Sequence, residues 1–267
     1  MSNLISRLLV GAVGLPVVLG LVWLGGWWLF GLVAVVGVVA VHEFVTIARP
    51  LRPLSPAAYI GTVLALVGAQ EGGVVWMLGG FLTTFVVAFA LNALSQTRAP
   101  STVAIGSTVL ASSWIGFGLG HVLLLRQLHD EPRLVVFTVL LTVFAASTFA
   151  YFGGRLLGRH KLAPTLSPGK TWEGFITGAI AGIFVAFVAL YQERDHFLLI
   201  WQAIVLGVVL VLAEVAGDLF ESMLKRDMDV KDTGRLLGGH GGMLDRIDAI
   251  LFAAPAAFYL ILGFGYA

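Results

Sequence analysis

Acidic, basic and glycine residues gather in one stretch near the C-terminal end of the chain. Ten charged residues fall between Lys225 and Asp248, together with His240 and two Gly-Gly pairs. Carboxylates are ligands that Mg²⁺ accepts, and lysine and arginine side chains bind phosphate oxygens. Glycine lets a backbone approach a ligand closely. The mixture therefore indicates a site for a divalent metal and a polyphosphate, and not a bilayer anchor alone.

Five acidic residues could supply the carboxylates. Glu214, Asp218 and Glu221 stand at i, i+4 and i+7, which places them on one helical face. Asp245 and Asp248 lie one turn apart at the start of the last apolar segment. Hydrogen bonding between helices, or capping of a helix N-terminus, would explain each group without a metal. Because one charged loop joins the two segments, we expect Asp218, Asp245 and Asp248 to converge on Mg²⁺.

Basic residues surround these acids and could hold phosphate oxygens. They are Lys225, Arg226, Lys231, Arg235 and Arg246. Attraction to anionic lipid explains basic residues beside a membrane, but it does not explain aspartates and glycines interleaved with them. The histidine of the Gly-Gly-His-Gly-Gly segment, His240, could donate to a phosphate, orient a neighbour or have a purely structural role.

A second motif runs from Ser167 to Gly174 and reads Ser-Pro-Gly-Lys-Thr-Trp-Glu-Gly. It resembles the end of a P-loop, but Pro164 stands where the first glycine belongs and no strand is predicted before it, so a Walker A motif is excluded. We expect a Ser-Pro turn that opens a helix. Its N–H groups, Lys170 and the Thr171 hydroxyl would face an anion; the alternative is a helix start without a ligand.

Composition sets the kind of element that must position these residues. The chain of 267 residues is 58% hydrophobic and 12% charged, whereas ordinary globular domains carry about 25% charged residues. Continuous apolar runs of membrane-crossing length predict an all-α, polytopic integral membrane protein with about nine transmembrane helices. The predicted spans are 7–24, 27–48, 56–70, 74–96, 101–125, 134–156, 172–191, 197–224 and 247–266. The absence of cysteine excludes disulfides and thiolate chemistry.

Charge divides the chain along its length and across the membrane. Residues 1–130 hold 8 of the 31 charged residues and residues 131–267 hold 23. We predict that 1–130 forms N-terminal transmembrane helices, a lipid-facing scaffold, and that 131–267 is a C-terminal transmembrane catalytic region with a cytoplasm-facing polar site. His42 and Glu43, in the second span, could line a cavity or have a structural role.

The positive-inside rule orients the predicted spans. The N-terminus and the loops after even-numbered spans hold 13 of the 16 Lys and Arg residues, and the other side holds three. This bias predicts a cytoplasmic N-terminus, an outside C-terminus and a cytoplasmic 225–246 loop. The net charge of +1 gives no indication of nucleic-acid binding.

The charged stretch resembles the signature of the phosphatidate cytidylyltransferases, or CDP-diacylglycerol synthases. The residues that stand at the family's spacing are Ser222, Lys225-Arg226, Lys231-Asp232, Gly234, His240-Gly241-Gly242, Asp245-Arg246 and Asp248. The segments from Phe149 to Pro164 and from Ser167 to Gly174 are also similar to that family, so the resemblance covers roughly residues 147–252. One position departs from it, because Ser147 stands where the family often carries an aspartate.

The resemblance implies transfer of CMP from CTP to phosphatidate, with Mg²⁺, alone or with a second cation, giving CDP-diacylglycerol and pyrophosphate. It implies metal ligation by Asp218, Asp245 and Asp248. It implies phosphate binding by Lys225, Arg226, Lys231 and Arg246, with Asp232 and His240 as further catalytic residues. Substrate would contact Ser167, Lys170, Thr171, Ser222, Gly241 and Gly242. The partners would be CTP, phosphatidate and the lipid bilayer of the inner cell membrane, without nucleic acid; a homodimer stays open.

Three other functions fit parts of the pattern. A related CTP-using lipid enzyme, of the polyprenol kinase or CDP-archaeol synthase type, would share the spans, the metal and CTP. An ion-coupled transporter would use Glu43, Glu214 and Asp218 as an ion path, but it predicts charges through the depth of the bilayer and paired broken helices. A non-catalytic membrane scaffold would leave the acidic cluster without a role.

Overall fold

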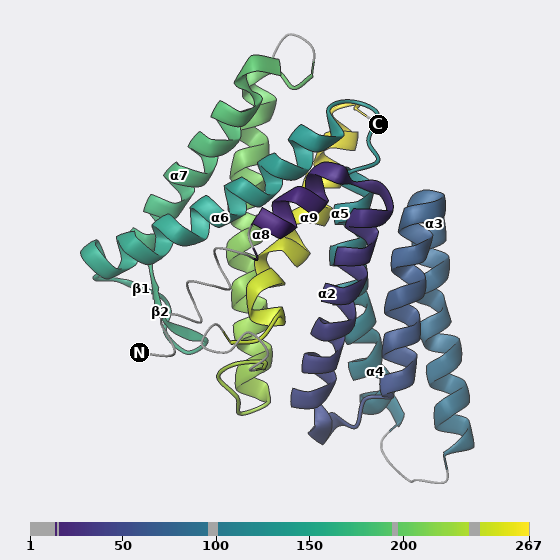
Figure 1. Cartoon of the computed structure of the whole chain (residues 1–267). Coiled ribbons are helices and arrows are strands. Elements are labelled where there is room, and N and C mark those ends of the chain that lie inside the picture. The colour runs from purple at the N-terminus through teal and green to yellow at the C-terminus, as the bar shows by residue number, and fades with distance from the viewer. Residues whose placement is uncertain (1–13, 15, 96–100, 194–196, 235–240, 267) are drawn as a thin grey trace. The chain divides into compact units, whose positions relative to one another are not determined.

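The computed structural model describes residues 14, 16–95, 101–193, 197–234 and 241–266, and it is helical almost throughout (Figure 1). Within these residues, seven helices are long and apolar enough to cross a membrane, so the prediction of an all-α polytopic membrane protein is confirmed. The predicted first span lies mostly outside the described residues. The count of nine spans and the orientation of the termini stay predictions.

The elements follow the apolar runs of the sequence. The first ones are α2 (Gly26–Ile47), η1 (Arg49–Leu51), α3 (Ser55–Leu94), α4 (Ser101–Ala111), the π-helical η2 (Ser112–Phe117) and α5 (Gly118–Leu125). The later ones are α6 (Pro132–Leu157), β1 (Lys161–Ala163), β2 (Ser167–Thr171), α7 (Trp172–Leu190), η3 (Tyr191–Glu193), α8 (Ile200–Asp227) and α9 (Leu244–Gly263).

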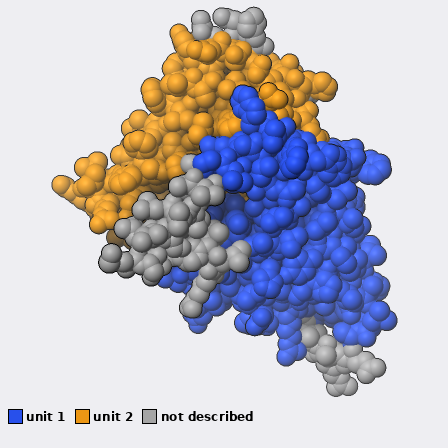
Figure 2. Space-filling view, viewed as in Figure 1, with its two compact units in different colours: residues 1–124, 227–247 blue, residues 125–226, 248–267 orange. Residues whose placement is uncertain are grey.

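The chain forms two compact units, coloured blue and orange in Figure 2. Unit 1 comprises residues 1–124 and 227–247, and unit 2 comprises residues 125–226 and 248–267. The segment 227–247, which the sequence analysis assigned to the C-terminal region, therefore packs with the N-terminal helices. The functional division at residue 130 stays a prediction.

Helix α3 of unit 1 covers two of the predicted spans, 56–70 and 74–96. Its 40 residues are interrupted at Gly73, whose φ of 68° lies in the region that favours glycine. The two arms fold back on each other and their backbones are close. A Cβ added at Gly68 would collide with the backbone of Trp76, and one added at Gly80 would collide with the backbone of Leu64. Small residues thus let two membrane helices approach closely, as is common in lipid.

Unit 2 is built on the close packing of α6 against α7. A Cβ at Gly174 would lie 2.7 Å from the Ala150 carbonyl oxygen, and one at Gly178 would lie 2.6 Å from the Ala146 carbonyl oxygen. The glycines at these crossing points bring the two backbones nearly into contact. The ends of α6 and α7 are thereby held together where the β1–β2 hairpin joins them.

The β1–β2 hairpin differs from the sequence prediction of a Ser-Pro turn. Residues Ser167–Thr171 form strand β2, which pairs antiparallel with β1. The predicted helix does open directly after it, since α7 begins at Trp172 and the Thr171 hydroxyl accepts from the Gly174 N–H at 3.1 Å. The two strands could not be predicted from the sequence, because each is shorter than a typical strand and the apolar alternation is absent.

Candidate active site

Unit 2 contains a cavity of about 420 Å³ that gathers polar side chains from three elements. Helix α6 contributes Ser147, Tyr151 and Arg155, and helix α8 contributes Glu214 and Asp218. The rest of the polar lining comes from β2, with Ser167, Lys170 and Thr171. All three side chains that the sequence predicted in the Ser-Pro-Gly-Lys-Thr motif therefore line this cavity.

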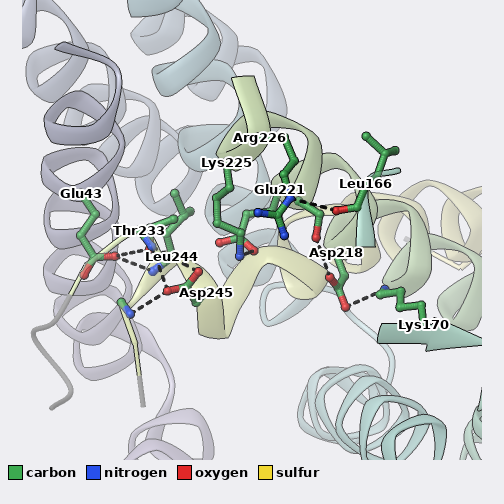
Figure 3. A network of polar contacts seen from close by, with 12 residues as sticks. Glu43, Leu166, Lys170, Asp218, Glu221, Lys225, Arg226, Thr233, Leu244 and Asp245 are labelled. Carbon is green, nitrogen blue, oxygen red and sulfur yellow. Dashed lines mark hydrogen bonds and ion pairs between the residues drawn. The ribbon is translucent and has the colours of Figure 1, made fainter. Parts of the chain in front are cut away.

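An ion pair joins the two sequence motifs across the cavity. Lys170 Nζ lies 2.6 Å from Asp218 Oδ2, as the right side of Figure 3 shows. The Lys170 side chain is 20% exposed and that of Asp218 is 36% exposed. Both charged groups are thus reachable from the cavity, and a phosphate-bearing ligand would meet a cation and a carboxylate side by side.

At Ser147, where the family often has an aspartate, a carboxylate is supplied by a neighbouring helix. The Ser147 hydroxyl donates to Glu214 Oε1 at 2.5 Å, which links α6 to α8. Glu214 is 4% exposed, and it lines the same cavity as Asp218. The carboxylate at this point of the cavity therefore comes from α8, where the resemblance leads one to expect an aspartate on α6.

The C-terminal turns of α8 carry three more of the predicted residues. The hydroxyl of Ser222 donates to Asp218 Oδ1 at 3.5 Å. The amine of Lys225 lies 2.6 Å from Glu221 Oε2, and the Glu221 side chain is 2% exposed. The guanidinium of Arg226 donates through Nε to the Leu166 carbonyl at 3.3 Å (Figure 3). Glu221 thus pairs with Lys225, while Glu214 and Asp218, which share its helical face in the sequence, line the cavity.

Asp248, the second predicted metal ligand of unit 2, is buried at 8% exposure. Its charge interacts with those of Asp218 and Lys225. Helices α8 and α9 are in close contact here: a Cβ added at Gly217 would lie only 2.6 Å from the Asp248 carbonyl oxygen. The structure therefore places Asp218 and Asp248 near each other, while their predicted convergence with Asp245 on a metal stays a prediction.

Asp245, the third predicted metal ligand, is described within unit 1. Its Oδ2 accepts from the Gly242 N–H at 2.7 Å and from the Thr233 N–H at 3.1 Å. Gly241 has a φ of 80° and a Cβ there would lie 2.9 Å from Asp245 Oδ2, so glycine is required at that turn. Among the described residues, no three His, Asp or Glu side chains are grouped as metal ligands, and the metal assignment stays a prediction.

The remaining predicted residues lie on the surface or outside the described chain. Lys231, Asp232 and Arg246 are exposed. His240 lies outside the described residues, as does Arg235. Their predicted roles are neither supported nor contradicted by their positions.

Glu43 of α2 is the residue whose position the sequence analysis left most open. It is 5% exposed, and its carboxyl oxygens accept from the Thr233 hydroxyl and from the Met243 and Leu244 N–H groups of unit 1 (left side of Figure 3). Its neighbour His42 is exposed and lies 2.9 Å, through Nδ1, from the Tyr59 hydroxyl in a separate pocket of about 300 Å³. The two adjacent side chains therefore lie in different environments, Glu43 buried against Thr233, Met243 and Leu244, and His42 exposed at a separate pocket.

The partners in two contacts of these clusters could not be predicted from the sequence. The Ser147–Glu214 pair is separated by 67 residues and the Glu43–Leu244 pair by 201 residues. Helical periodicity relates residues three or four apart and cannot pair residues on different helices. The only signal was that a charged residue within an apolar span needs a partner.

Comparison with known proteins agrees with this arrangement of motifs. A sequence model of the Cytidylyltransferase family matches residues 5–264. A phosphatidate cytidylyltransferase of Mycobacterium bovis is 34% identical over 97% of this chain and 88% of its own length. Proteins of the same name from Haemophilus influenzae and Staphylococcus haemolyticus are 33% and 29% identical, over 86% and 96% of this chain and over 87% and 98% of their own lengths.

These matches extend over nearly the whole chain and include both motif-bearing units. The resemblance that rested on residues 147–252 therefore holds from the first helices to the last. The chain belongs to the Cytidylyltransferase family and is a nucleotidyltransferase of the phosphatidate cytidylyltransferase kind.

Proposed function

We propose that the protein transfers CMP from CTP to phosphatidate, giving CDP-diacylglycerol and pyrophosphate. The proposal follows the names of its relatives and rests on one observation above all. The Lys170–Asp218 pair joins the two motifs within a cavity that hydroxyl and cationic groups line. Such a cavity offers phosphate-binding groups at the edge of apolar helices, where a nucleotide and a lipid headgroup can meet.

The chemistry requires one bond to form and one to break. An oxygen of the phosphatidate phosphate attacks the α-phosphorus of CTP and forms the new P–O bond. The bond from that phosphorus to the oxygen bridging the β-phosphate breaks, and pyrophosphate leaves with the electron pair. A phosphate monoester is largely ionised at neutral pH, because its second pKa is about 6, so no general base is needed.

Positioning and charge stabilisation then account for most of the catalysis. Lys170 would hold a phosphate oxygen in the cavity, with the Ser167 and Thr171 hydroxyls beside it. The predicted phosphate-binding residues of the α8 end and the following loop would neutralise the departing pyrophosphate. They are Lys225, Arg226, Lys231 and Arg246.

The carboxylates of unit 2 fit a magnesium ion. Asp218 faces the cavity with hard oxygen donors, and Asp248 lies close enough for the two charges to interact. Asp245 would be the third ligand, as the sequence predicts. When bound, Mg²⁺ would neutralise charge on the phosphates; a second cation and the homodimer remain predictions.

The inner membrane, with a cytoplasmic site, is the location that best suits this reaction. Phosphatidate would stay in the bilayer while CTP arrives from the cytoplasm. Two described contacts agree with the predicted orientation, since each joins segments that the positive-inside rule assigns to one side. The Lys170–Asp218 pair does so in unit 2, and the Glu43–Leu244 hydrogen bond does so in unit 1.

Product analysis on the purified protein tests the proposal. The protein would be incubated with phosphatidate, Mg²⁺ and CTP labelled at either the α- or the γ-phosphate. We expect α-label in the lipid and γ-label in pyrophosphate in equal amounts. Label from the γ-phosphate in the lipid, with release of CDP, would instead identify a kinase. Archaeal-type lipid and polyprenol as alternative acceptors would reveal a related CTP-using enzyme.

A further inference from the structure

Glu43 is a carboxyl group that the proposed reaction leaves without a role. It lies in α2, a helix otherwise made of apolar and small residues apart from its neighbour His42, and it is 5% exposed. A polar group buried in this way is retained only when hydrogen bonds replace its lost water. The partners of Glu43 therefore indicate what it does.

All three described partners of Glu43 belong to the loop and helix start that carry the family signature. Oε1 accepts from the Met243 N–H at 2.9 Å. Oε2 accepts from the Leu244 N–H at 2.9 Å and from the Thr233 hydroxyl at 3.1 Å. The two N–H groups lie at the N-terminus of α9, where they have no partner within the helix. Glu43 thus caps α9 from a different helix, about 200 residues away along the chain.

The signature glycines leave room for this carboxyl group. A Cβ at Gly234 would collide with Glu43 Oε1, and a Cβ at Gly242 would collide with Glu43 Oε2 and the Thr233 hydroxyl. The backbone at both positions therefore approaches Glu43 closely. The small size of these glycines is explained by packing around an acid of unit 1, in addition to any contact with a ligand.

The same loop connects Glu43 to Asp245. Thr233 donates its hydroxyl to Glu43 and its backbone N–H to Asp245. Asp245 also accepts from Gly242, which lies directly before the two residues that Glu43 caps. The two acids therefore hold Thr233 and the start of α9 between them, as the left side of Figure 3 shows. Displacing either acid would move the backbone that orients the other.

We propose that Glu43 is a positioning residue: it fixes Thr233 and the start of α9 at Met243 and Leu244, and so sets the orientation of Asp245 for nucleotidyl transfer. It acts through this loop and does not touch the substrates. The proposal rests on the proposed function for its kinetic consequence. The anchoring itself concerns backbone hydrogen bonds and can be measured without any turnover.

The test compares Glu43→Gln with Glu71→Gln in the full-length protein in lipid nanodiscs. Glutamine keeps the size of the side chain but replaces one acceptor oxygen with a donor, which must face one of the three donors. Glu71 is an exposed residue of α3, so the same change there controls for loss of a carboxylate in unit 1. Thr233→Val removes a single partner and should give a smaller effect.

Two measurements separate positioning from a general loss of structure. Hydrogen exchange followed by mass spectrometry should show faster exchange in Glu43→Gln only in peptides covering 228–247, with α3 and α6 unchanged. The kcat should fall roughly 10- to 100-fold, as for other groups that orient a site from behind. The KM for CTP and for phosphatidate should stay within about threefold of wild type. The double variant Glu43→Gln/Thr233→Val should lose less than the sum of the two single variants, since the Thr233 hydroxyl acts through Glu43.

Any other result would contradict the proposed positioning role of Glu43. Unchanged exchange in 228–247 would mean that Glu43 does not hold the loop. Faster exchange across the whole chain would make Glu43 a residue of general stability. Local loosening with unchanged kcat would separate the loop from catalysis. A wild-type protein that forms no CDP-diacylglycerol would refute the proposed function alone, because the exchange result still decides whether Glu43 anchors the loop.

Discussion

The carboxylates of the two units differ in what surrounds them. Asp218 of unit 2 faces a cavity, has a side chain that is 36% exposed and pairs with Lys170. Glu43 of unit 1 is 5% exposed, and its oxygens are taken up by two N–H groups and a hydroxyl. A carboxylate that accepts several main-chain N–H groups serves the fold, whereas one that faces a cavity beside a cation is available for a ligand. We therefore assign the carboxyl group two different roles in one chain, and the following variants test that division.

Asp218→Asn should have the largest effect on activity. The change keeps the shape of the side chain but removes the charge that faces the cavity, so kcat should fall roughly 100- to 1,000-fold. Initial rates of lipid labelling from α-labelled CTP measure it. Asp229→Asn is the matched control, because Asp229 is exposed and has a φ of 54°, which asparagine tolerates. Comparable rates in the two variants would contradict the role of Asp218.

Lys225→Met should reduce stability in addition to weakening the binding of phosphate. The substitution removes the partner of Glu221, whose side chain is 2% exposed, and an uncompensated buried charge costs about 3 kcal/mol. Unfolding of the detergent-solubilised protein would measure the loss. The double variant Lys225→Met/Glu221→Gln should recover stability. If it also recovers full activity, Lys225 has no part in phosphate binding and its role is structural.

Gly242→Ala should disturb unit 1 while leaving the unit 2 cavity intact. Its Cβ would collide with the Glu43 carboxyl group and the Thr233 hydroxyl, and overpacking of this kind costs about 1–3 kcal/mol. Gly106→Ala in α4 is the control, since a Cβ there meets nothing within 4 Å. Thermal unfolding should separate the two variants. Equal unfolding temperatures would mean that the Glu43 contact is looser than described.

Ser147→Asp should give the smallest change. It would place a second carboxylate against Glu214, and like charges at hydrogen-bond distance repel. We expect a fall in kcat of about tenfold, equivalent to about 1.4 kcal/mol in the barrier. The exchanged pair Ser147→Asp/Glu214→Ser restores one carboxylate and one hydroxyl, so it should regain most of the activity. A double variant no better than Ser147→Asp would show that the carboxylate must come from α8.

The sequence predicted the elements better than their contacts. Apolar run length was enough for α6, α7 and α8, and a turn at Gly73 was enough for the two arms of α3. The positive charges and carboxylates of one stretch were enough to indicate the chemistry. The prediction of a Ser-Pro turn in place of the β1–β2 hairpin was wrong, because a strand pair this short has no periodic pattern.

Contacts between distant helices could not be predicted in the same way. Lys170 and Asp218 belong to two motifs that the sequence identified separately, and only the fold places them 2.6 Å apart. Glu43 was recognised as unusual within an apolar span, yet nothing local indicates that its partners begin 190 residues later. Such pairings depend on which helices are neighbours, and hydrophobic periodicity does not specify this.

The central claim is that nucleotidyl transfer depends on the cavity in which Lys170 faces Asp218. The most direct measurement is the rate of CDP-diacylglycerol formation by Lys170→Met beside Lys161→Met. Lys161 lies on the same hairpin, but it is exposed and donates to the Pro168 carbonyl oxygen at 2.7 Å. We expect Lys170→Met to lower kcat/KM roughly 100-fold or more, and Lys161→Met to stay within about threefold of wild type. Equal activity of the two variants would contradict the assignment of this cavity as the active site.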